Sequence, residues 1–505
     1  MAELHHGTTL VPSKLDLLTG WMGSQRWYAA KGSLPRLSRL AAWRLGDPAG
    51  EVGIETHIVH DAGGPHPVTY QVPLTYRGAP VEGLEHALVG TMEHGVLGRR
   101  WVYDAPHDPV YVRELLALIA GDVAAESSTQ SGTADESFTG EAASDWLAPR
   151  TASRTTTVEL HGSGTRRLRV SGSRVLSGEQ SNTSIIVDAT DESGTAQPTI
   201  VKVFRTLSPG ENPDVVLQSA LRAAGCPLVP AVFGAVRGSW PIAPPTGDSP
   251  VMAHGHLAFA QEYIPGTEDA WRVALRAAES GADFTDAAGD LGAATASVHT
   301  SLAEVLPTAE ASPQDISRIT AVMRRRLAAA SAHVTEIAER AAEIEAAFAA
   351  AETAPWPALQ RIHGDYHLGQ VLHSPARGWI LLDFEGEPLR PLAERSQPDS
   401  HFRDVAGMLR SFDYAGGSAE HSGAVASARP WVSASVTAFL DGYSGAAGDP
   451  REHPDLLRAF LLDKALYEVV YEARNRPSWL AIPVAAVIRL LAEPGAPPPQ
   501  RGSSS

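Results

Sequence analysis

Two carboxylates and an amide in the C-terminal half of the chain have the types and spacing that phosphoryl transfer requires. Asp365 follows a His-Gly pair, Gln370 comes five residues later, and Asp383 follows an apolar, strand-like run. A kinase needs one carboxylate to receive the acceptor hydroxyl's proton, and an amide and a second carboxylate to hold Mg²⁺ on the nucleotide phosphates. The Asp-to-amide spacing and the DFEG sequence at 383–386 match that template. The segment therefore predicts a kinase of a small molecule.

Each member of this group has an expected role. Asp365 is expected to act as the general base or to orient the acceptor hydroxyl, because the preceding glycine allows a tight turn. Gln370 and Asp383 offer the hard oxygen ligands that suit Mg²⁺, and Glu385 either adds an outer or water-mediated contact to the metal or is simply exposed. A turn or a strand-end cap would explain each residue alone, whereas the phosphoryl-transfer template explains them together.

The nucleotide is expected to bind to strands that precede this segment. Lys202 lies between valines in TIVKVFR, as does the lysine that binds the α- and β-phosphates in kinases. Ser181 and Asn182 lie in a loop that has no GxGxxG pattern, and it either covers the phosphates of ATP or forms a simple hairpin. Adenine is expected to take main-chain hydrogen bonds at a strand end formed by Gln261, Glu262 and Tyr263.

Other chemistries fit the sequence less well. His363, His367 and His373 lack the glutamate of an HExxH zinc motif, so we interpret them as structural hydrogen-bonding residues. The chain has no GxSxG nucleophile elbow, and its single cysteine, Cys226, is interpreted as an inert thiol. A glycoside-active enzyme would need two carboxylates flanking a sugar cleft, without the lysine and the amide ligand.

The composition restricts the partners. The 505 residues include 58 acidic and 41 basic ones, for a net charge of −17, which argues against nucleic-acid or anionic-membrane partners. The N-terminus has no continuous apolar stretch of the signal-peptide kind, and no run of 18 apolar residues occurs. We expect a cytoplasmic protein, a monomer or weak homo-oligomer, whose partners are a sugar and ATP.

The order of elements predicts an α+β architecture with several domains. Residues 1–123 mix short strands with a helical run, and 124–156 are rich in Ser, Thr, Ala, Gly and acids, which predicts a flexible loop. Residues 157–265 form a β-rich, nucleotide-binding part, and a helix is expected after Lys202, with a start at Asn212–Pro213. Residues 266–498 are predominantly helical, with the catalytic segment on a short strand pair between helices.

The segments HGDYHLGQVL, DFEGEPLRPLAER, QRWYAAKG, IVKVFR and YEVVYEARNRPSWLAIP closely resemble the maltokinase-like group of actinobacterial sugar kinases. That group belongs to the aminoglycoside-phosphotransferase-like superfamily, and the resemblance covers nearly the whole chain. It implies a bilobal eukaryotic-protein-kinase-like fold with an N-terminal cap domain, and the use of ATP and Mg²⁺. By position, it implies that Asp365 is the catalytic base, Gln370 and Asp383 are Mg²⁺ ligands, and Lys202 anchors the phosphates.

Two acceptors are known among these relatives: maltose, phosphorylated by maltokinases, and glucosamine, phosphorylated at O6 by glucosamine kinases. The chain departs from the maltokinase pattern in its N-terminal third and in the segment 124–156, so glucosamine is favoured over maltose. An ammonium group needs carboxylates nearby, for which the C-terminal part offers candidates, and an aromatic ring suits a sugar face. The acceptor-binding candidates are Asp404, Glu468 and Trp479. An aminoglycoside kinase and a non-catalytic, pseudokinase-like binding protein remain alternatives.

Overall fold

The computed structural model describes residues 9–128, 133–143, 168–176, 181–191, 193–244, 250–388 and 390–492. The chain divides into two compact units. Unit 1 comprises Met1–Val215 and Ala231–Pro265, and unit 2 comprises Val216–Pro230 and Gly266–Ser505. Unit 2 resumes at Gly266, where the helical part was expected to begin, and the expected cap and β-rich ranges lie together in unit 1.

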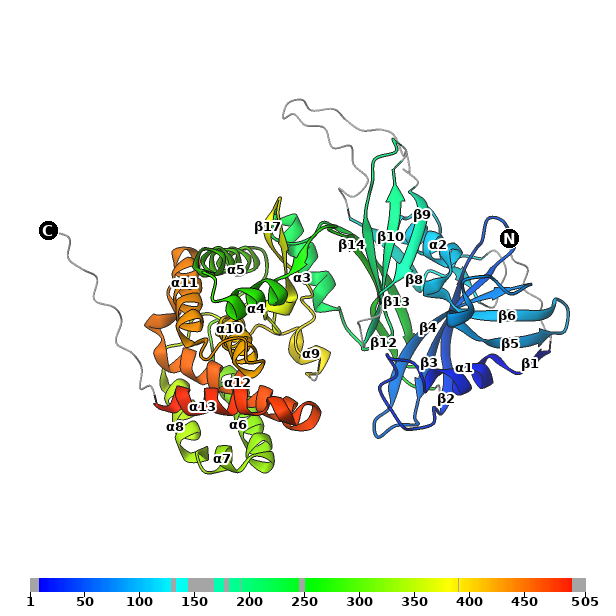
Figure 1. The fold of residues 1–505 in the computed structure, drawn as a ribbon. Coiled ribbons are helices and arrows are strands. Elements are labelled where there is room, and N and C mark those ends of the chain that lie inside the picture. Colours follow the sequence, from blue (N-terminus) through cyan, green and yellow to red (C-terminus); the bar gives the residue numbers. More distant parts are fainter. Residues whose placement is uncertain are drawn as a thin grey trace. The chain divides into compact units, whose positions relative to one another are not determined.

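Unit 1 is built mainly of antiparallel strands (Figure 1). Its elements are β1 (Leu10–Val11), α1 (Lys14–Met22), β2 (Leu37–Leu45), β3 (Gly53–Asp61), β4 (Val68–Arg77), η1 (Glu85–Ala87), β5 (Leu88–His94), β6 (Gly98–Asp104), η2 (Ala105–His107), α2 (Pro109–Ala120), β7 (Glu126–Ser127), β8 (Phe138–Ala142), β9 (Arg169–Val175), β10 (Asn182–Thr190), β11 (Thr199–Phe204), β12 (Thr206–Leu207), β13 (Val232–Pro241) and β14 (Met252–Glu262). The helix α3 (Pro213–Ala223) begins in unit 1 and continues in unit 2.

The strands form two sheets. The first has the order β1-β5-β6-β4-β3-β2-β7, with β12 paired to β4, and the second has the order β8-β13-β14-β11-β10-β9. Lys202 on β11 lies opposite Ser184 on β10 and Phe259 on β14, so it occupies a central strand. Because neighbours on both sides fix the register of β11, the face to which each of its side chains belongs is set.

The segment expected to be a flexible loop, 124–156, is ordered in part. It contains β7 and β8, and β8 pairs with β13 along the edge of the second sheet. Phe138 on β8 is buried and stacks on Trp43, and this contact supplies the apolar burial that the composition of the segment did not predict. The prediction of a flexible loop is therefore wrong for β7 and β8, while 129–132 and 144–156 lie outside the described residues.

Unit 2 is mostly helical, as expected (Figure 1). Its elements are β15 (Glu268–Asp269), α4 (Ala270–Ser280), α5 (Thr285–Val305), α6 (Pro313–His333), α7 (Thr335–Ala338), α8 (Ala341–Thr353), η3 (Leu368–Gln370), β16 (Val371–Ser374), β17 (Gly378–Leu381), α9 (Leu392–Arg395), α10 (Phe402–His421), α11 (Arg429–Ala447), η4 (Pro450–Glu452), α12 (Pro454–Asn475), η5 (Pro477–Trp479) and α13 (Ala481–Ala492). The strands form one small sheet in the order β15-β16-β17.

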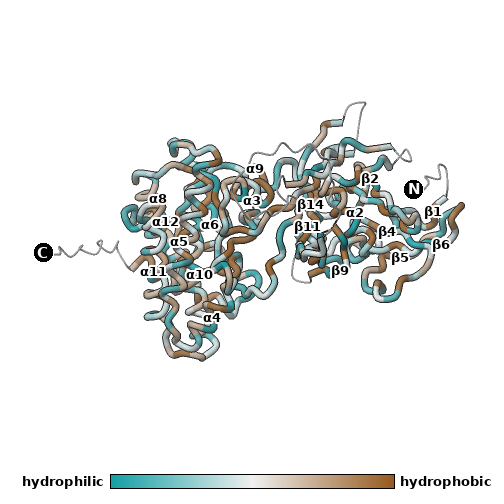
Figure 2. The backbone as a smooth tube through the Cα atoms, turned by 90° about the horizontal axis from the view of Figure 1, so that it is seen from above, coloured by the Kyte–Doolittle hydropathy of each residue, from teal (hydrophilic) through white to brown (hydrophobic). Residues whose placement is uncertain are grey.

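Small residues let the helices of unit 2 pack closely. A Cβ atom added to Gly292 on α5 would lie 2.0 Å from the carbonyl oxygen of Phe439 on α11, and one added to Gly442 would lie 2.0 Å from that of Gly289. The helix pair α5 and α11 therefore requires glycine at its contact. In Figure 2 hydrophobic residues recur along the helices of unit 2 and along the strands of unit 1, as expected for elements that each cover a core.

Within the described residues, no helix combines the length and the apolar character that crossing a membrane requires. The longest one, α12, carries charged residues throughout its 22 positions.

Candidate active site

The turn that carries Asp365 is held by a buried carboxylate of α10. Asp404 accepts hydrogen bonds from the backbone N–H groups of His363 and Gly364, both at 2.8 Å, and its Oδ2 lies 3.0 Å from Nε2 of His299. Gly364 has a φ of +83°, a conformation that glycine adopts without strain. Asp404 is fully buried. The backbone of the turn is thus fixed on α10 immediately before Asp365.

The residues after Asp365 also rest on α10. A Cβ atom added to Gly407 would lie 2.4 Å from the carbonyl oxygen of Tyr366, so the helix and the loop that carries Asp365 are in direct contact there. Ser411, one turn further along α10, accepts a hydrogen bond from the N–H of Leu368 at 3.1 Å. Asp365 therefore lies on a loop that one helix supports at several points.

The carboxylate of Asp365 pairs with Lys464 on α12. Nζ of Lys464 donates to Oδ1 of Asp365 at 3.0 Å, and the two side chains are 14% and 18% exposed. Burial raises the pKa of Asp365, but the Lys464 ammonium together with His367 and His363 outweighs it and lowers that pKa to about 2. Asp365 is therefore ionised at neutral pH. Lys464 lies 99 residues away in the sequence, and no motif pointed to it.

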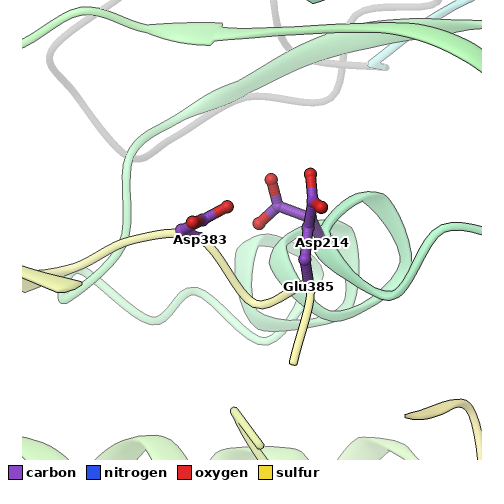
Figure 3. A group of neighbouring side chains, drawn as sticks. All are labelled: Asp214, Asp383 and Glu385. Atoms are coloured by element: carbon purple, nitrogen blue, oxygen red, sulfur yellow. The ribbon is translucent and has the colours of Figure 1, made fainter. Parts of the chain in front are cut away.

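Asp383 and Glu385 lie on the loop after β17, and Figure 3 shows their side chains, with that of Asp214 at the start of α3. Asp383 has a φ of +62°, the only positive φ of a residue other than glycine among the described residues. Such a conformation costs free energy and is concentrated at functional sites. Carboxylate oxygens of Asp383 and Glu385 lie within 4.8 Å of one another, which agrees with a shared cation.

Backbone contacts join the segment of Gln370 to that of Asp383. The N–H of Leu382 donates to the carbonyl oxygen of Gln370 at 2.9 Å, and Nε2 of His363 lies 2.8 Å from the carbonyl oxygen of Leu382. His367 is the N-cap residue of η3, and its Nδ1 accepts a hydrogen bond from the N–H of Gly369. The expectation that His363 and His367 are structural hydrogen-bonding residues is confirmed.

In unit 1, Lys202 pairs with an acidic side chain at the start of α3. Its Nζ donates to Oδ2 of Asp214 at 2.8 Å, and the side chains are 9% and 0% exposed. Asp214 is the second residue of α3, and Oδ1 of Asn212 accepts from its N–H. The expected helix start at Asn212–Pro213 is confirmed. The other acidic neighbour, Glu211, pairs with Arg237 instead.

The remaining nucleotide-site candidates lie near Lys202 in the second sheet. Asn182 is the first residue of β10 and lies opposite Phe204, and Ser181 directly precedes it. Gln261 and Glu262 end β14. The N–H of Glu262 donates to the carbonyl oxygen of Ala231 at 2.8 Å, and the N–H of Tyr263 donates to the carbonyl oxygen of Pro198 at 2.9 Å. These two N–H groups have partners within unit 1, and the expectation that adenine takes main-chain hydrogen bonds at this strand end stays a prediction.

The three acceptor-site candidates have different environments. Asp404 is buried beneath the turn, so it positions backbone instead of offering a carboxylate to a sugar, which corrects our expectation. Glu468 on α12 pairs with Arg410 at 2.5 Å. The ring of Trp479 stacks on Tyr414 with centroids 6.1 Å apart. Arg476 also packs over the Trp479 ring, at 5.2 Å from its centroid.

Comparisons with known proteins give this geometry a family context. Residues 21–108 match the family described as Maltokinase N-terminal cap domain, and residues 173–387 match the one described as Phosphotransferase enzyme family. A glucosamine kinase of Mycolicibacterium smegmatis is 30% identical over 352 residues, which cover 64% of this chain and 80% of that protein. A glucosamine kinase of Streptacidiphilus jiangxiensis is 28% identical over 355 residues, 64% of this chain and 75% of that protein.

Among solved structures, a glucosamine kinase in complex with glucosamine, ADP and inorganic phosphate superimposes with a TM-score of 0.62 at 22% identity. The match covers 95% of this chain and 99% of that one. At this level of identity the likeness establishes the fold, and the bilobal kinase-like fold with an N-terminal cap is confirmed.

Proposed function

The chain belongs to the family of the glucosamine kinases, and from that premise we propose that it transfers the γ-phosphoryl group of ATP to glucosamine, giving glucosamine 6-phosphate and ADP. The observation that carries the proposal is the arrangement of Asp365 in unit 2. Its turn is fixed by Asp404, its charge is maintained by Lys464, and its segment is joined by hydrogen bonds to that of Asp383.

In the proposed reaction Asp365 orients the acceptor hydroxyl. The oxygen of the sugar forms a bond to the γ-phosphorus while the bond from that phosphorus to the β-bridging oxygen of ATP breaks. With a pKa of about 2, Asp365 is a weak base. It therefore accepts the hydroxyl proton only as the new bond forms and the acidity of that proton rises, which fits the loose transition state of phosphoryl transfer.

We assign Gln370, Asp383 and Glu385 to the Mg²⁺ that accompanies ATP. Their side chains supply amide and carboxylate oxygens, the hard donors that this ion prefers, and the two carboxylates are close enough to share it. When bound, Mg²⁺ supplies charge neutralisation for the phosphates. The left-handed backbone of Asp383 sets the direction in which its side chain leaves the loop.

We assign Lys202 to the phosphates of ATP, with Ser181 and Asn182 on the adjoining strand as further contacts. Asp214 keeps the Lys202 ammonium in one position, as a glutamate does in protein kinases. The main-chain carbonyl groups at the end of β14, near Gln261, remain the expected partners of adenine.

For the acceptor, Glu468 and Trp479 remain our candidates. Glu468 already has Arg410 as its partner, so an ammonium group would share this carboxylate with a guanidinium. A sugar stacked on Trp479 would have to displace Arg476, whose side chain is 46% exposed and therefore has little burial to lose. Asp404 is no longer a candidate.

The test is a panel of acceptors. Purified protein with Mg·ATP would be given glucosamine, glucose, N-acetylglucosamine, maltose or kanamycin, and ADP release would be followed. We expect the highest kcat/KM with glucosamine, and in Asp365→Asn a fall in kcat of at least about 10²-fold, since a positioned proton acceptor typically contributes that much. Turnover confined to another acceptor would refute glucosamine. Equal rates in wild type and Asp365→Asn would refute the catalytic assignment.

Maltose is the second candidate acceptor, because residues 21–108 match a cap domain that is named for maltokinases. The same panel separates the two. The position of the new phosphate, at O6 of glucosamine or at O1 of maltose, is read by ³¹P–¹H correlation in the product.

A further inference from the structure

The two carboxylate oxygens of Asp365 have different environments. Oδ1 accepts a hydrogen bond from Lys464, whereas no group in the described part of the chain donates to Oδ2. The Asp365 side chain is 18% exposed, so it reaches the surface of unit 2. Oδ1 is therefore paired with the Lys464 ammonium, and Oδ2 can accept the hydrogen bond of an incoming hydroxyl.

The neighbours of Lys464 leave it directed to Asp365. Glu468, one turn along α12, pairs with Arg410, and Glu387 pairs with Arg326. The ring of Tyr467 lies 4.9 Å from Nζ and adds a cation–π contact. The titratable groups that act directly on Asp365 are Lys464, His367 and His363. Glu387 and Glu468 act on Lys464, and Glu387 also acts on Tyr467.

Lysine is the rarer choice of cation in this protein. Only four of its 41 basic residues are lysine, at positions 14, 31, 202 and 464. An arginine spans both oxygens of a carboxylate, as Arg77 does on Asp108 with hydrogen bonds of 2.8 and 2.7 Å. An ammonium is a compact point charge that can remain on one oxygen. At position 464 this difference determines whether Oδ2 of Asp365 stays available.

We propose that Lys464 is a positioning residue for phosphoryl transfer, which holds one oxygen of Asp365 so that the other orients the acceptor hydroxyl, and which repels the ammonium group of an amino sugar from that position. The second part rests on the proposed function. Like charges a few ångströms apart are unfavourable, whereas a bare Asp365 would attract the ammonium and bind glucosamine with the wrong group at the point of transfer.

The first test separates charge from structure by pH. In Lys464→Met, burial acts on Asp365 without a compensating ammonium, so its pKa rises and the active, ionised form is lost as pH falls. We expect kcat of this variant to fall about tenfold between pH 8 and pH 5, and wild type to change less than about twofold. Matching pH profiles would overturn the proposal. If Lys464→Met does not fold, Lys464→Gln replaces it.

The second test uses arginine. Lys464→Arg keeps the charge, so its kcat should not acquire the acid limb of Lys464→Met, yet a guanidinium that spans both oxygens should lower kcat by about 10-fold or more at every pH. An Arg variant with wild-type kcat would show that Oδ2 need not be kept open. Arg325→Met, which removes an exposed cation from α6, is the matched control and should leave both kcat and its pH profile unchanged.

The third test addresses the ammonium. With glucosamine, non-productive binding in Lys464→Met should lower kcat and KM together, whereas glucose, which has no ammonium, should show a fall in kcat alone. Equal changes for both sugars would refute this part. The pH test uses whichever sugar wild type phosphorylates, or ATP hydrolysis in water if it phosphorylates none. If wild type phosphorylates a sugar other than glucosamine, the proposed function is refuted. The pH test with that sugar still decides the role of Lys464.

Discussion

Two buried charges of the candidate site each have a close partner of opposite charge. Lys202 is held by Asp214, and Asp365 by Lys464. Removing one partner of a buried ion pair leaves an uncompensated charge and strongly destabilises the folded protein. A substitution in either pair therefore affects folding as well as chemistry. Kinetic constants of such variants are therefore best read together with their thermal unfolding.

His57 on β3 is a buried histidine whose titration should make unit 1 sensitive to acid. Its side chain is 1% exposed, and burial lowers its pKa to about 4, against the pull of Glu55. In the unfolded chain a histidine takes up a proton near pH 6.5, whereas folded His57 stays neutral down to about pH 4. The contribution of neutral His57 to the free energy of unfolding is complete above pH 6.5 and is lost as pH falls toward 4. At pH 5 the loss amounts to about 2 kcal/mol.

We therefore expect the unfolding midpoint of wild type to fall between pH 7.5 and pH 5, and to fall less in His57→Gln. Thermal unfolding followed by circular dichroism at both pH values measures this difference. Other buried histidines contribute equally to both proteins, so the difference between them reports His57 alone. An identical fall in the two proteins would contradict the lowered pKa.

At the level of elements, α10 supports the loop that carries Asp365. Gly407 lets the helix approach Tyr366, and a methyl group there would lie 2.4 Å from a carbonyl oxygen. Gly407→Ala should therefore displace the loop that carries Asp365. Because a misplacement of about 1 Å can cost 10²-fold in rate, we expect kcat to fall by about that factor with little change in KM for ATP.

The matched control for this substitution is Gly445→Ala. Gly445 lies on α11, and nothing is within 4 Å of an added Cβ atom. Alanine is the better helix former, so this variant should keep wild-type kcat and gain up to about 1 kcal/mol in stability. Steady-state kinetics on both variants give the comparison, and equal kcat values would show that α10 does not position the loop.

The elements that could be predicted from the sequence are those with local signals. The helix that begins at Pro213 has a capping asparagine before it, and the turn before Asp365 has its glycine. The strand β8 has no comparable signal, because its burial depends on Trp43, which lies nearly a hundred residues earlier. The polar composition of 124–156 gives no indication of a contact with so distant a residue.

The same distinction applies to the site. Asp365, Gln370 and Asp383 form a motif in one segment, so their proximity follows from local geometry. Lys464 is brought to Asp365 by the packing of α12, and its role leaves no mark on the neighbouring sequence. The burial of Asp404 under the turn depends on how α10 packs. Its carboxylate, which we expected to bind an ammonium group, instead accepts hydrogen bonds from two backbone N–H groups.

For the whole molecule, the two units have separate hydrophobic cores. We therefore expect two transitions in calorimetric unfolding. ATP should raise the midpoint of the transition of unit 1, which contains Lys202, and Lys202→Met should reduce that shift, since stabilisation by a ligand follows its affinity. Arg237→Met, which removes a part-exposed cation from β13 of the same unit, is the control. A single transition would show that the units unfold cooperatively.

The backbone of Asp383 also limits how the chain can change over evolutionary time. Its φ of +62° is tolerated by glycine, asparagine and aspartate and by few other residues. Of these, glycine removes the oxygen that we propose as a ligand of Mg²⁺ and asparagine removes the negative charge, while both leave the loop able to fold. With the role we propose for Asp383, drift at this one codon would abolish catalysis before it harmed the fold, and a descendant with Asn or Gly here would be a well-folded homologue that has lost its reaction.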